Sequence, residues 1–329
     1  MSRKIRFGVL GAAKIARTKV VPAMQLGQFT EVTAIASRDA AKAKAAAAEL
    51  GLATSYGSYE ELLADPDIDA IYNPLPNHLH VPWSARAAEA GKHVLCEKPL
   101  ALNSDEIRSL IAVRDRTGVK MSEAYMVLTH PQWLRAREIV RSGEIGELRS
   151  FVSAFSYFNR DPKNVRNVEE WGGGAVIDIG CYPITMSRFI FGEEPVKVAS
   201  FIERDPDFGT DRLSSAMLEY PSGHAIFTCS TQLTPFQIVQ ILGTKGRIEI
   251  EIPWNAPPNL PTRIMVEKGG YLHDGERRIE EFAVCDQYTI QGDRFAKAIL
   301  ENGPVEMPLA ESLKNMAVIE AVLSGGFVS

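Results

Sequence analysis

The chain has 329 residues, of which 45% are hydrophobic and 23% charged, and its formal net charge is −5. This length predicts two domains, each large enough to bury its own core, and the small, mixed charge excludes nucleic acids and anionic membrane surfaces as favoured partners. No apolar run is long enough to span a bilayer, so we expect a soluble, cytoplasmic protein that binds neither membranes nor nucleic acid.

Strand and helix patterns alternate at short intervals through the first 125 residues. The predicted strands cover residues 4–11, 31–37, 68–74, 92–98 and 120–125. The predicted helices cover residues 13–24, 39–51, 58–65, 77–91 and 103–118. Short apolar strands interleaved with helices indicate βαβ units around a buried parallel sheet. The pattern therefore predicts a doubly wound α/β domain over residues 1–125.

The turn after the first strand carries a variant of the dinucleotide-binding fingerprint G-x-G-x-x-G. Gly11 takes the first place, Ala13 the second and Ala16 the third. Glycine permits the tight turn, and a small residue at 13 lets the backbone approach a pyrophosphate. The first helical residues, Lys14 and Ile15, would offer N–H groups and a partial positive charge. A plain βα turn has the same pattern, but at the first βα unit of a parallel sheet it predicts a bound dinucleotide.

The end of the second strand distinguishes NAD from NADP. An NAD site requires a carboxylate there for the ribose hydroxyls. This chain has Ser37 and Arg38 instead, and Asp39 is a plausible N-cap of the following helix. A hydroxyl and a guanidinium suit a 2′-phosphate, to which they can make charge-assisted hydrogen bonds. The pattern favours NADP, and NAD is the alternative if Asp39 faces the ribose.

Three predicted strands end in unusually polar, proline-rich stretches, at residues 73–80, 96–100 and 122–131. Doubly wound sheets bind their ligands at the carboxyl ends of their strands. We therefore predict that Pro74, Asn77, His80, Glu97 and Lys98 line the cofactor site. Glu123, at the end of the third of these strands, could also meet the ribose or the nicotinamide. The alternative for Lys98 is that it only caps a strand beside a turn-forming proline.

Neither the histidines nor the cysteines form a metal-binding pattern. Asn77 is a plausible helix N-cap, which would place His78 and His80 in a first helical turn near the cofactor, and no third ligand has suitable spacing. His130 could line the substrate pocket or be a turn residue. The cysteines are widely spaced, which predicts reduced thiols in the core; they are Cys96, Cys181, Cys229 and Cys285. We predict no metal.

After residue 125 the pattern changes to longer alternating strands. A helix is predicted over residues 131–143, and strands are predicted over 148–158, 197–205, 214–220 and 224–233. Helices over 287–303 and 309–326 close the chain. Runs of strands separated by turns indicate a mostly antiparallel sheet. We predict a second, α+β domain over residues 126–329.

Three motifs together resemble one known family. They are "PNHLH" (76–80), "GKHVLCEKPLA" (91–101) and "GGGAVIDIGCYPI" (172–184). With the βαβ pattern they resemble the glucose-fructose oxidoreductase / inositol dehydrogenase / MocA family of NAD(P)-dependent sugar oxidoreductases, over essentially the whole chain. Within that family, the tyrosine in "DIGCY" and the stretch "EAYMVLTHP" (123–131) resemble the D-xylose dehydrogenase and dimeric dihydrodiol dehydrogenase branch.

The resemblance implies a Rossmann domain followed by a substrate-binding domain with an open, mostly antiparallel sheet. The flat face of that sheet often makes the oligomer contact, so a homodimer or tetramer is expected. The resemblance also implies that Lys98 lies near the nicotinamide and the substrate, that Pro99 is cis, and that Asp178 and Tyr182 are polar partners of the reaction. Pro183 follows directly, and a kink there would take Asp178 and Tyr182 off a shared helix face.

These residues support a specific chemistry. Oxidation of a sugar hydroxyl needs a base for the proton while hydride leaves carbon for the nicotinamide. Tyr182 could be this acid/base, because a nearby ammonium such as that of Lys98 favours a phenolate, and Asp178 could hold a substrate hydroxyl or orient the lysine. The alternatives are that Tyr182 is only a packed aromatic and that Asp178 only caps a turn.

The sequence therefore predicts an NADP-dependent oxidoreductase that moves hydride between nicotinamide and a pyranose sugar. The reaction would oxidise an aldose at C1 to a lactone, or run in reverse as a carbonyl reduction. Alternatives are a trans-dihydrodiol dehydrogenase and a sugar–sugar oxidoreductase that retains its cofactor. A non-catalytic sensor of NADP and sugar is a further alternative of a different class.

Overall fold

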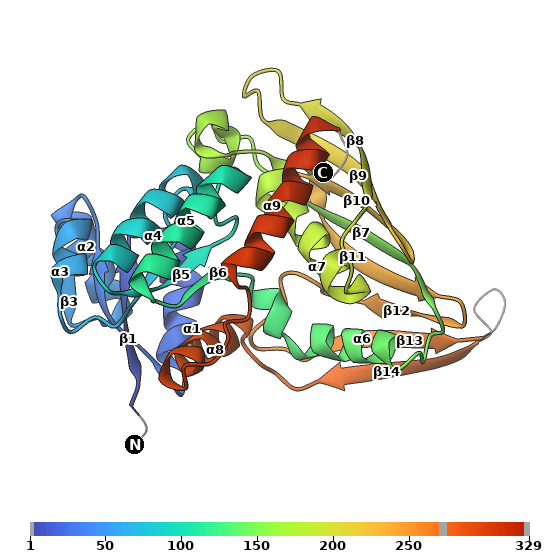
Figure 1. Ribbon diagram of the computed structural model, residues 1–329, viewed down its shortest axis with the longest axis horizontal. Coiled ribbons are helices and arrows are strands. Elements are labelled where there is room, and N and C mark those ends of the chain that lie inside the picture. The colour runs from blue at the N-terminus through green and yellow to red at the C-terminus, as the bar shows by residue number, and fades with distance from the viewer. Residues whose placement is uncertain (1–2, 270–274, 326–329) are drawn as a thin grey trace. The chain divides into compact units, whose positions relative to one another are not determined.

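The computed structural model describes residues 3–269 and 275–325 (Figure 1). Its internal contacts divide the chain into two units, Met1–Met126 with Asp286–Lys314, and Val127–Cys285 with Asn315–Ser329. From the sequence we predicted a boundary near residue 125 between a cofactor-binding domain and a substrate-binding domain. This division by function stays a prediction. The pattern did not anticipate that residues 286–314 group with the first unit.

The first unit is built on a six-stranded sheet with the order β3-β2-β1-β4-β5-β6. The strands are β1 (Ile5–Leu10), β2 (Thr30–Ala36), β3 (Thr54–Tyr56), β4 (Ala70–Asn73), β5 (His93–Glu97) and β6 (Met121–Ala124). All paired strands are parallel. The predicted doubly wound Rossmann sheet is thereby confirmed. Strand β3 was not predicted, because three residues are too few to show a hydrophobic period.

Helices cover both faces of this sheet. They are α1 (Val21–Gln25), α2 (Ala40–Leu50), α3 (Tyr59–Ala64), α4 (His80–Glu89), α5 (Ser104–Thr117) and α8 (Gln287–Leu300). On one face, Phe295 of α8 packs against Phe7 of β1, with ring centroids 6.2 Å apart. On the other face, Gly8 leaves room for α3, since a Cβ there would lie 3.0 Å from Leu62. The return of α8 therefore completes the core of the first unit.

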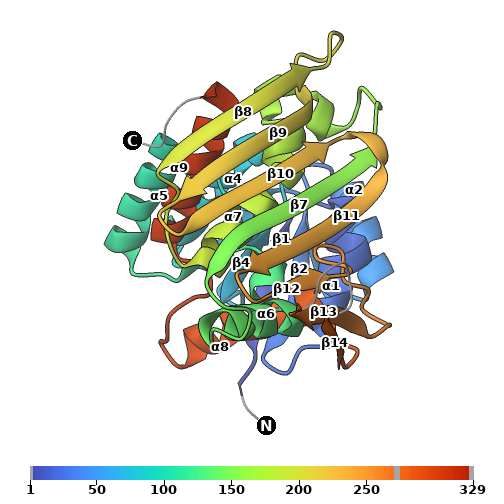
Figure 2. The same cartoon turned by 90° about the vertical axis from the view of Figure 1, so that its right-hand side faces the viewer.

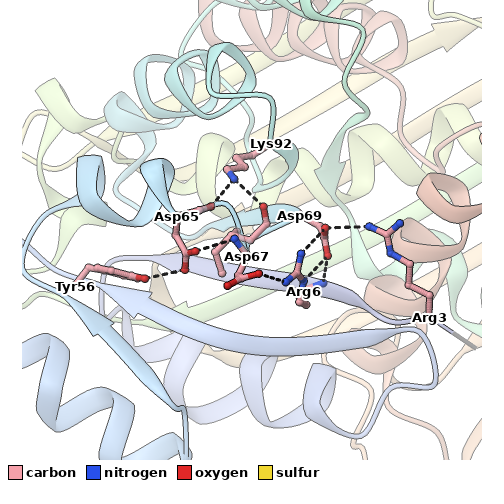
Figure 3. A network of polar contacts seen from close by, with 8 residues as sticks. Arg3, Arg6, Tyr56, Asp65, Asp67, Asp69 and Lys92 are labelled. Atoms are coloured by element: carbon pink, nitrogen blue, oxygen red, sulfur yellow. Dashed lines mark hydrogen bonds and ion pairs between the residues drawn. The ribbon is translucent and has the colours of Figure 1, made fainter. Parts of the chain in front are cut away.

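A polar network joins the amino-terminal ends of β1, β4 and β5 (Figure 3). Arg6 donates from Nε to Asp69 at 3.1 Å and from Nη1 to Asp67 at 2.7 Å. Lys92 Nζ donates to the backbone carbonyl of Asp65 at 2.6 Å. We call this set the amino-edge network. It lies at the edge of the sheet opposite the carboxyl ends of the strands.

The second unit is built on an eight-stranded sheet with the order β14-β13-β12-β11-β7-β10-β9-β8. The strands are β7 (Leu148–Phe158), β8 (Lys197–Arg204), β9 (Asp211–Tyr220), β10 (Gly223–Ser230), β11 (Gln232–Gly243), β12 (Gly246–Ile250), β13 (Thr262–Lys268) and β14 (Glu276–Phe282). The inner pair β7 and β10 is parallel, and the other pairs are antiparallel. The prediction of a mostly antiparallel sheet is confirmed.

Two helices of the second unit, α6 (Pro131–Arg141) and α7 (Cys181–Phe191), lie on one side of this sheet. Helix α9 (Leu309–Ser324) begins in the first unit and ends in the second; Gly326, the end of its predicted span, lies outside the described residues. No helix in the described part of the chain is long and apolar enough to cross a membrane.

The other side of the eight-stranded sheet presents apolar side chains to solvent. In Figure 2 strands β8, β9, β10, β7 and β11 face the viewer, with α7 behind them. Phe201, Met217, Ile226 and Phe236 are 85%, 44%, 40% and 52% exposed on these strands. Apolar side chains gathered on one flat surface indicate an interaction face.

Candidate active site

The turn after β1 is shaped for a close approach of backbone to a ligand. Gly11 has φ +82°, and a Cβ there would lie 2.8 Å from Leu75 Cδ2, so a larger residue is excluded. Its N–H donates to the carbonyl of Ala36 at 2.8 Å. The helix begins at Lys14, which is exposed, and continues through a π-helical turn, Ala16–Val20. This glycine cradle fits a pyrophosphate.

Ala13 and Ile15 fill the inner side of the same turn. Both are half-buried and pack against the core formed by β1 and its neighbouring helices. The alanine in the second fingerprint position therefore contributes to packing as well as leaving space. Their predicted contacts with a cofactor stay predictions.

The end of β2 carries a cation beside the nucleotide turn. Asp39 accepts hydrogen bonds from the backbone N–H groups of Ala41 and Lys42 at 3.0 and 3.1 Å, and so caps α2 as predicted. Ser37 Oγ accepts from the Asp39 N–H at 3.2 Å. Arg38 is exposed. Asp39 uses only Oδ1 for the cap and is exposed as well, so a guanidinium and a carboxylate lie next to each other at this position.

Tyr59 and His78 place Arg38 relative to the turn. Burial raises the pKa of Tyr59, and the nearby Arg38 guanidinium partly offsets this rise. Burial lowers the pKa of His78, and the charge of Arg38 lowers it further. The Tyr59 hydroxyl lies 3.5 Å from the Cβ position at Gly11. Arg38 is thus near the turn at Gly11.

Lys98 follows β5 directly and is half-exposed. The preceding residue is anchored, because the Tyr72 hydroxyl of β4 donates to Glu97 Oε1 at 2.7 Å. The Lys98–Pro99 peptide bond is cis, as the resemblance implied. The structure therefore places Lys98 at the carboxyl edge of the parallel sheet, as predicted.

The stretch 73–80 packs against this lysine turn. His80 is buried, with Nδ1 2.7 Å from the Pro99 carbonyl oxygen and Nε2 2.6 Å from that of Leu75. Burial lowers the pKa of His80 to about 4, so at neutral pH its single N–H donates to one of these carbonyls at a time. Pro74 is buried in the same stretch.

The prediction that Asn77 is a helix N-cap is wrong. Asn77 is the first residue of a 3₁₀ turn, Asn77–Leu79, and the cap position is occupied by Pro76, which offers no side-chain hydrogen bond. The proline takes the extended conformation that precedes the turn. The turn then leads into α4 at His80.

Glu123, at the end of β6, is buried and is not exposed where a ligand could contact it. Its Oε1 accepts a 2.8 Å hydrogen bond from the Leu100 N–H. Burial raises its pKa to about 7, and this hydrogen bond from the Leu100 N–H acts against that rise. From the sequence we predicted Glu123 only as a contact for ribose or nicotinamide. The sequence did not indicate its hydrogen bond to the chain after Pro99.

In the second unit, Asp178 and Tyr182 lie on one continuous helical segment. A π-helical turn, Val176–Gly180, runs directly into α7. Pro183 does not end the helix, because it is the third residue of α7, which runs on to Phe191.

Asp178 is bound by two side chains that the sequence did not single out. Its Oδ2 accepts from the Tyr157 hydroxyl at 2.5 Å and from Arg166 Nε at 2.7 Å. Burial and the Asp178 charge raise the pKa of Tyr157, and the same carboxylate raises the pKa of Arg166. Arg166 belongs to the stretch 158–167, a connection without regular periodicity, so no sequence signal paired it with Asp178.

Tyr182 has a buried ring. It packs edge-on against Phe155 at a centroid distance of 5.9 Å and near Trp254 at 5.7 Å. Its phenol also lies close enough to Arg166 to contribute to that guanidinium's raised pKa. The ring is therefore packed, which agrees with the alternative that Tyr182 is a packed aromatic residue. Arg166 and Asp178 lie close to the same ring. Its role as acid/base stays a prediction.

His130 is explained as a turn residue. It is buried, and its Nδ1 accepts from the Gln132 N–H at 3.3 Å, which caps α6. Its Nε2 lies 3.6 Å from Cys285 Sγ. Within residues 3–269 and 275–325, no group of three or more His, Cys, Asp or Glu side chains is arranged to hold a metal ion.

Comparisons with known proteins match both parts of the chain. Residues 5–125 match the model of an oxidoreductase family with an NAD-binding Rossmann fold, and residues 133–249 match the GFO/IDH/MocA C-terminal domain. An uncharacterised oxidoreductase of Rhizobium meliloti is 48% identical, covering 97% of this chain and 96% of its own. An NADP(+)-dependent D-xylose 1-dehydrogenase of Haloferax volcanii is 38% identical, covering 96% and 95%.

A solved structure is similar along the whole length. The 3-ketoreductase of Actinomadura kijaniata, in complex with NADP and TDP-benzene, is 31% identical with a TM-score of 0.91. The match covers 98% of each chain.

Proposed function

The chain belongs to the GFO/IDH/MocA family of oxidoreductases, and on that basis we propose that it is an NADP-dependent dehydrogenase acting on a pyranose sugar. Oxidation of an aldose at C1 removes a hydride from carbon and a proton from the hydroxyl, and it leaves a lactone. NADP⁺ supplies the hydride acceptor when bound. The observation that carries the proposal is Lys98, held at the carboxyl edge of a dinucleotide-binding sheet beside an anchored Glu97.

The cofactor would be held by two groups of residues. Gly11, Ala13, Lys14 and Ile15 would face the pyrophosphate. Ser37 and Arg38 would bind the 2′-phosphate, which supports NADP over NAD because Asp39 is already used as a helix cap. The D-xylose dehydrogenase and the ketoreductase reported above both carry NADP in their names or structures.

The remaining predicted cofactor residues lie at the carboxyl edge of the sheet. They are Pro74, Asn77, His80, Glu97 and Lys98. His80 and Glu97 have internal partners in the structure, so in this proposal they shape the nicotinamide side of the site rather than donate to the cofactor directly.

The proton would be handled by Tyr182 with Lys98. The Lys98 ammonium would favour the phenolate and hold the reacting oxygen, and such positioned proton transfer contributes about 10²- to 10⁴-fold. Solved variants of the ketoreductase carry a substituted lysine or a substituted tyrosine. Along that sequence the two substituted positions are separated by the same number of residues as Lys98 and Tyr182 are in this chain. Asp178, held by Arg166 and Tyr157, would present its carboxylate to a substrate hydroxyl or to the lysine.

The protein would act as a cytoplasmic homo-oligomer. The exposed apolar face of the eight-stranded sheet, with Phe201, Met217, Ile226 and Phe236, supports a second copy as the partner. Sedimentation should show a dimer or tetramer, and a Phe201→Glu/Ile226→Glu double variant should sediment as a monomer. A wild-type monomer would refute this assembly.

The test of the function is the absorbance of reduced nicotinamide with NADP⁺ or NAD⁺ and a panel of aldoses, inositols and trans-dihydrodiols. Turnover of an aldose with NADP⁺, lost in Tyr182→Phe, would support the proposal. Turnover confined to dihydrodiols would make the protein a trans-dihydrodiol dehydrogenase. Reduction of one sugar coupled to oxidation of another, without released NADPH, would indicate a retained cofactor. NADP binding without any turnover would indicate the sensor.

A further inference from the structure

The peptide that follows Lys98 and Pro99 is held from both sides by buried side chains. His80 Nδ1 lies 2.7 Å from the Pro99 carbonyl oxygen, and Glu123 Oε1 accepts a 2.8 Å hydrogen bond from the Leu100 N–H. This carbonyl and this N–H belong to one planar peptide unit. Contacts at both ends of a rigid plane fix its orientation. We call the pair His80 and Glu123 the peptide clamp.

The chain before the lysine is fixed as well. The Tyr72 hydroxyl holds Glu97 at 2.7 Å, and Glu97 pairs with Ala124 in the parallel sheet. Lys98 therefore stands between an anchored carboxylate and a clamped peptide. Its half-exposed side chain leaves from a backbone whose direction is set on both sides.

Packing alone does not account for the clamp. His80 and Glu123 are 1% and 4% exposed, and burying polar groups costs free energy that an apolar residue of similar size would avoid. The cost shows in the titration of both groups, since burial lowers the pKa of His80 to about 4 and raises that of Glu123 to about 7. His80 also contacts the Leu75 carbonyl, so it ties the stretch 73–80 to the Pro99–Leu100 peptide. Two buried polar groups that meet at one peptide beside one lysine indicate a positional role.

We propose that His80 and Glu123 are positioning residues, which orient the Lys98 ammonium by clamping the Pro99–Leu100 peptide. The inference rests on the proposed function of Lys98. A displacement of about 1 Å at a reacting group costs about 10²-fold in rate. Loss of either half of the clamp should therefore lower kcat by about 10- to 100-fold.

The decisive comparison is Glu123→Leu against Glu123→Gln. Glutamine keeps an oxygen that can accept from the Leu100 N–H, and leucine does not. Glu123→Gln should restore most of the kcat that Glu123→Leu loses. An equal loss in both variants would mean that the charge of Glu123 matters rather than the clamp, and wild-type kcat in Glu123→Leu would also overturn the proposal.

The other half of the clamp is tested with His80→Ala, and this variant also serves if Glu123→Leu does not fold. The matched control is His93→Ala, since His93 Nδ1 accepts a 2.9 Å hydrogen bond from the Lys120 N–H at the opposite edge of the sheet. His80→Ala should lower kcat, whereas His93→Ala should affect only thermal stability. Equal kcat in the two variants would contradict a positioning role.

A readout without substrate separates this inference from the proposed function. Acetic anhydride labels lysine side chains, and peptide mass spectrometry gives the rate at Lys98. Loosening of the clamp should make Lys98 label several-fold faster in Glu123→Leu and His80→Ala, with Glu123→Gln close to wild type. Altered labelling in a protein without turnover would retain the clamp and reject the dehydrogenase. Unchanged labelling in all variants would reject the clamp.

Discussion

The two edges of the parallel sheet carry polar side chains in opposite electrostatic states. At the amino edge, burial alone would raise the pKa of Asp69, but hydrogen bonds from Arg6 outweigh it and lower that pKa. At the carboxyl edge, burial prevails, raising the pKa of Glu123 and lowering that of His80. In the amino-edge network, Arg6 keeps Asp69 charged and paired. The carboxyl edge holds an acid and a base towards their neutral forms.

This difference separates a structural role from a functional one. Ion pairs such as Arg6–Asp69 and Arg6–Asp67 stabilise locally and add modestly to the free energy of unfolding. Buried groups that are pushed away from their ordinary pKa are typical of sites where protons move or side chains are oriented. The comparison predicts that substitutions at the two edges will change different observables.

The largest effect is expected at Lys98. Lys98→Ala should lower kcat by about 10²- to 10⁴-fold, since both an acid/base partner and a contact to the reacting oxygen are lost. The thermal midpoint should stay close to wild type, because the side chain is half-exposed. Initial rates with NADP⁺ and an aldose, together with a thermal melt, check both parts. A large loss of stability with intact kcat would assign Lys98 to the structure instead.

A pH-dependent effect on stability is expected at Glu123. Its pKa is about 7 in the folded chain and 4.5 in the unfolded reference, so its protonated form stabilises the fold below pH 4.5. That contribution is lost as the pH rises through 7. The loss is at most about 3 kcal/mol. Urea unfolding of wild type and Glu123→Gln between pH 4.5 and 8 should show the difference. Parallel curves for the two proteins would refute the raised pKa.

A smaller effect, restricted to one cofactor, is expected at Arg38. Charge-assisted hydrogen bonds contribute about 1.5–3 kcal/mol, so Arg38→Ala should weaken NADP binding by about 10- to 100-fold. Binding of NAD should not weaken, because NAD has no 2′-phosphate. Titration calorimetry with both dinucleotides measures the ratio. Equal weakening of both would place Arg38 elsewhere than at the 2′-phosphate.

The smallest effect is expected at the amino edge. Asp69→Asn keeps the volume but removes the charge that faces Arg6, so the thermal midpoint should fall slightly at neutral pH. The difference from wild type should shrink as the pH falls from 3.8, the ordinary pKa, through the lowered pKa of the folded carboxylate. The value of kcat should not change. A lower kcat would show that the two edges are coupled.

Much of the fold was predictable because it is encoded locally. Alternating short strands and helices predicted the parallel sheet, and Gly11, Asp39 and Lys98 occupy the turn, cap and strand end that their neighbours indicated. The short strand β3 and the parallel pairing of β7 with β10 were not predicted. Strand order depends on packing between distant segments, which a hydrophobic period does not specify.

Within the candidate site, only the residues that belong to sequence motifs were predictable. Lys98 and Tyr182 stand in recognisable stretches, whereas the partners of Asp178 and of the Pro99–Leu100 peptide come from elsewhere in the sequence. Arg166 reaches Asp178 from an irregular connection, and Glu123 reaches Leu100 from the neighbouring strand. Such partners are brought together by sheet register, so they become visible only in three dimensions.

One measurement tests the contrast between the edges most directly. NADPH formation from an aldose and urea unfolding are measured on the same preparations of Lys98→Ala and Asp69→Asn. We expect Lys98→Ala to lose turnover and keep its stability, and Asp69→Asn to lose stability and keep its turnover. If Lys98→Ala retains wild-type turnover, the carboxyl edge is not the site of the chemistry.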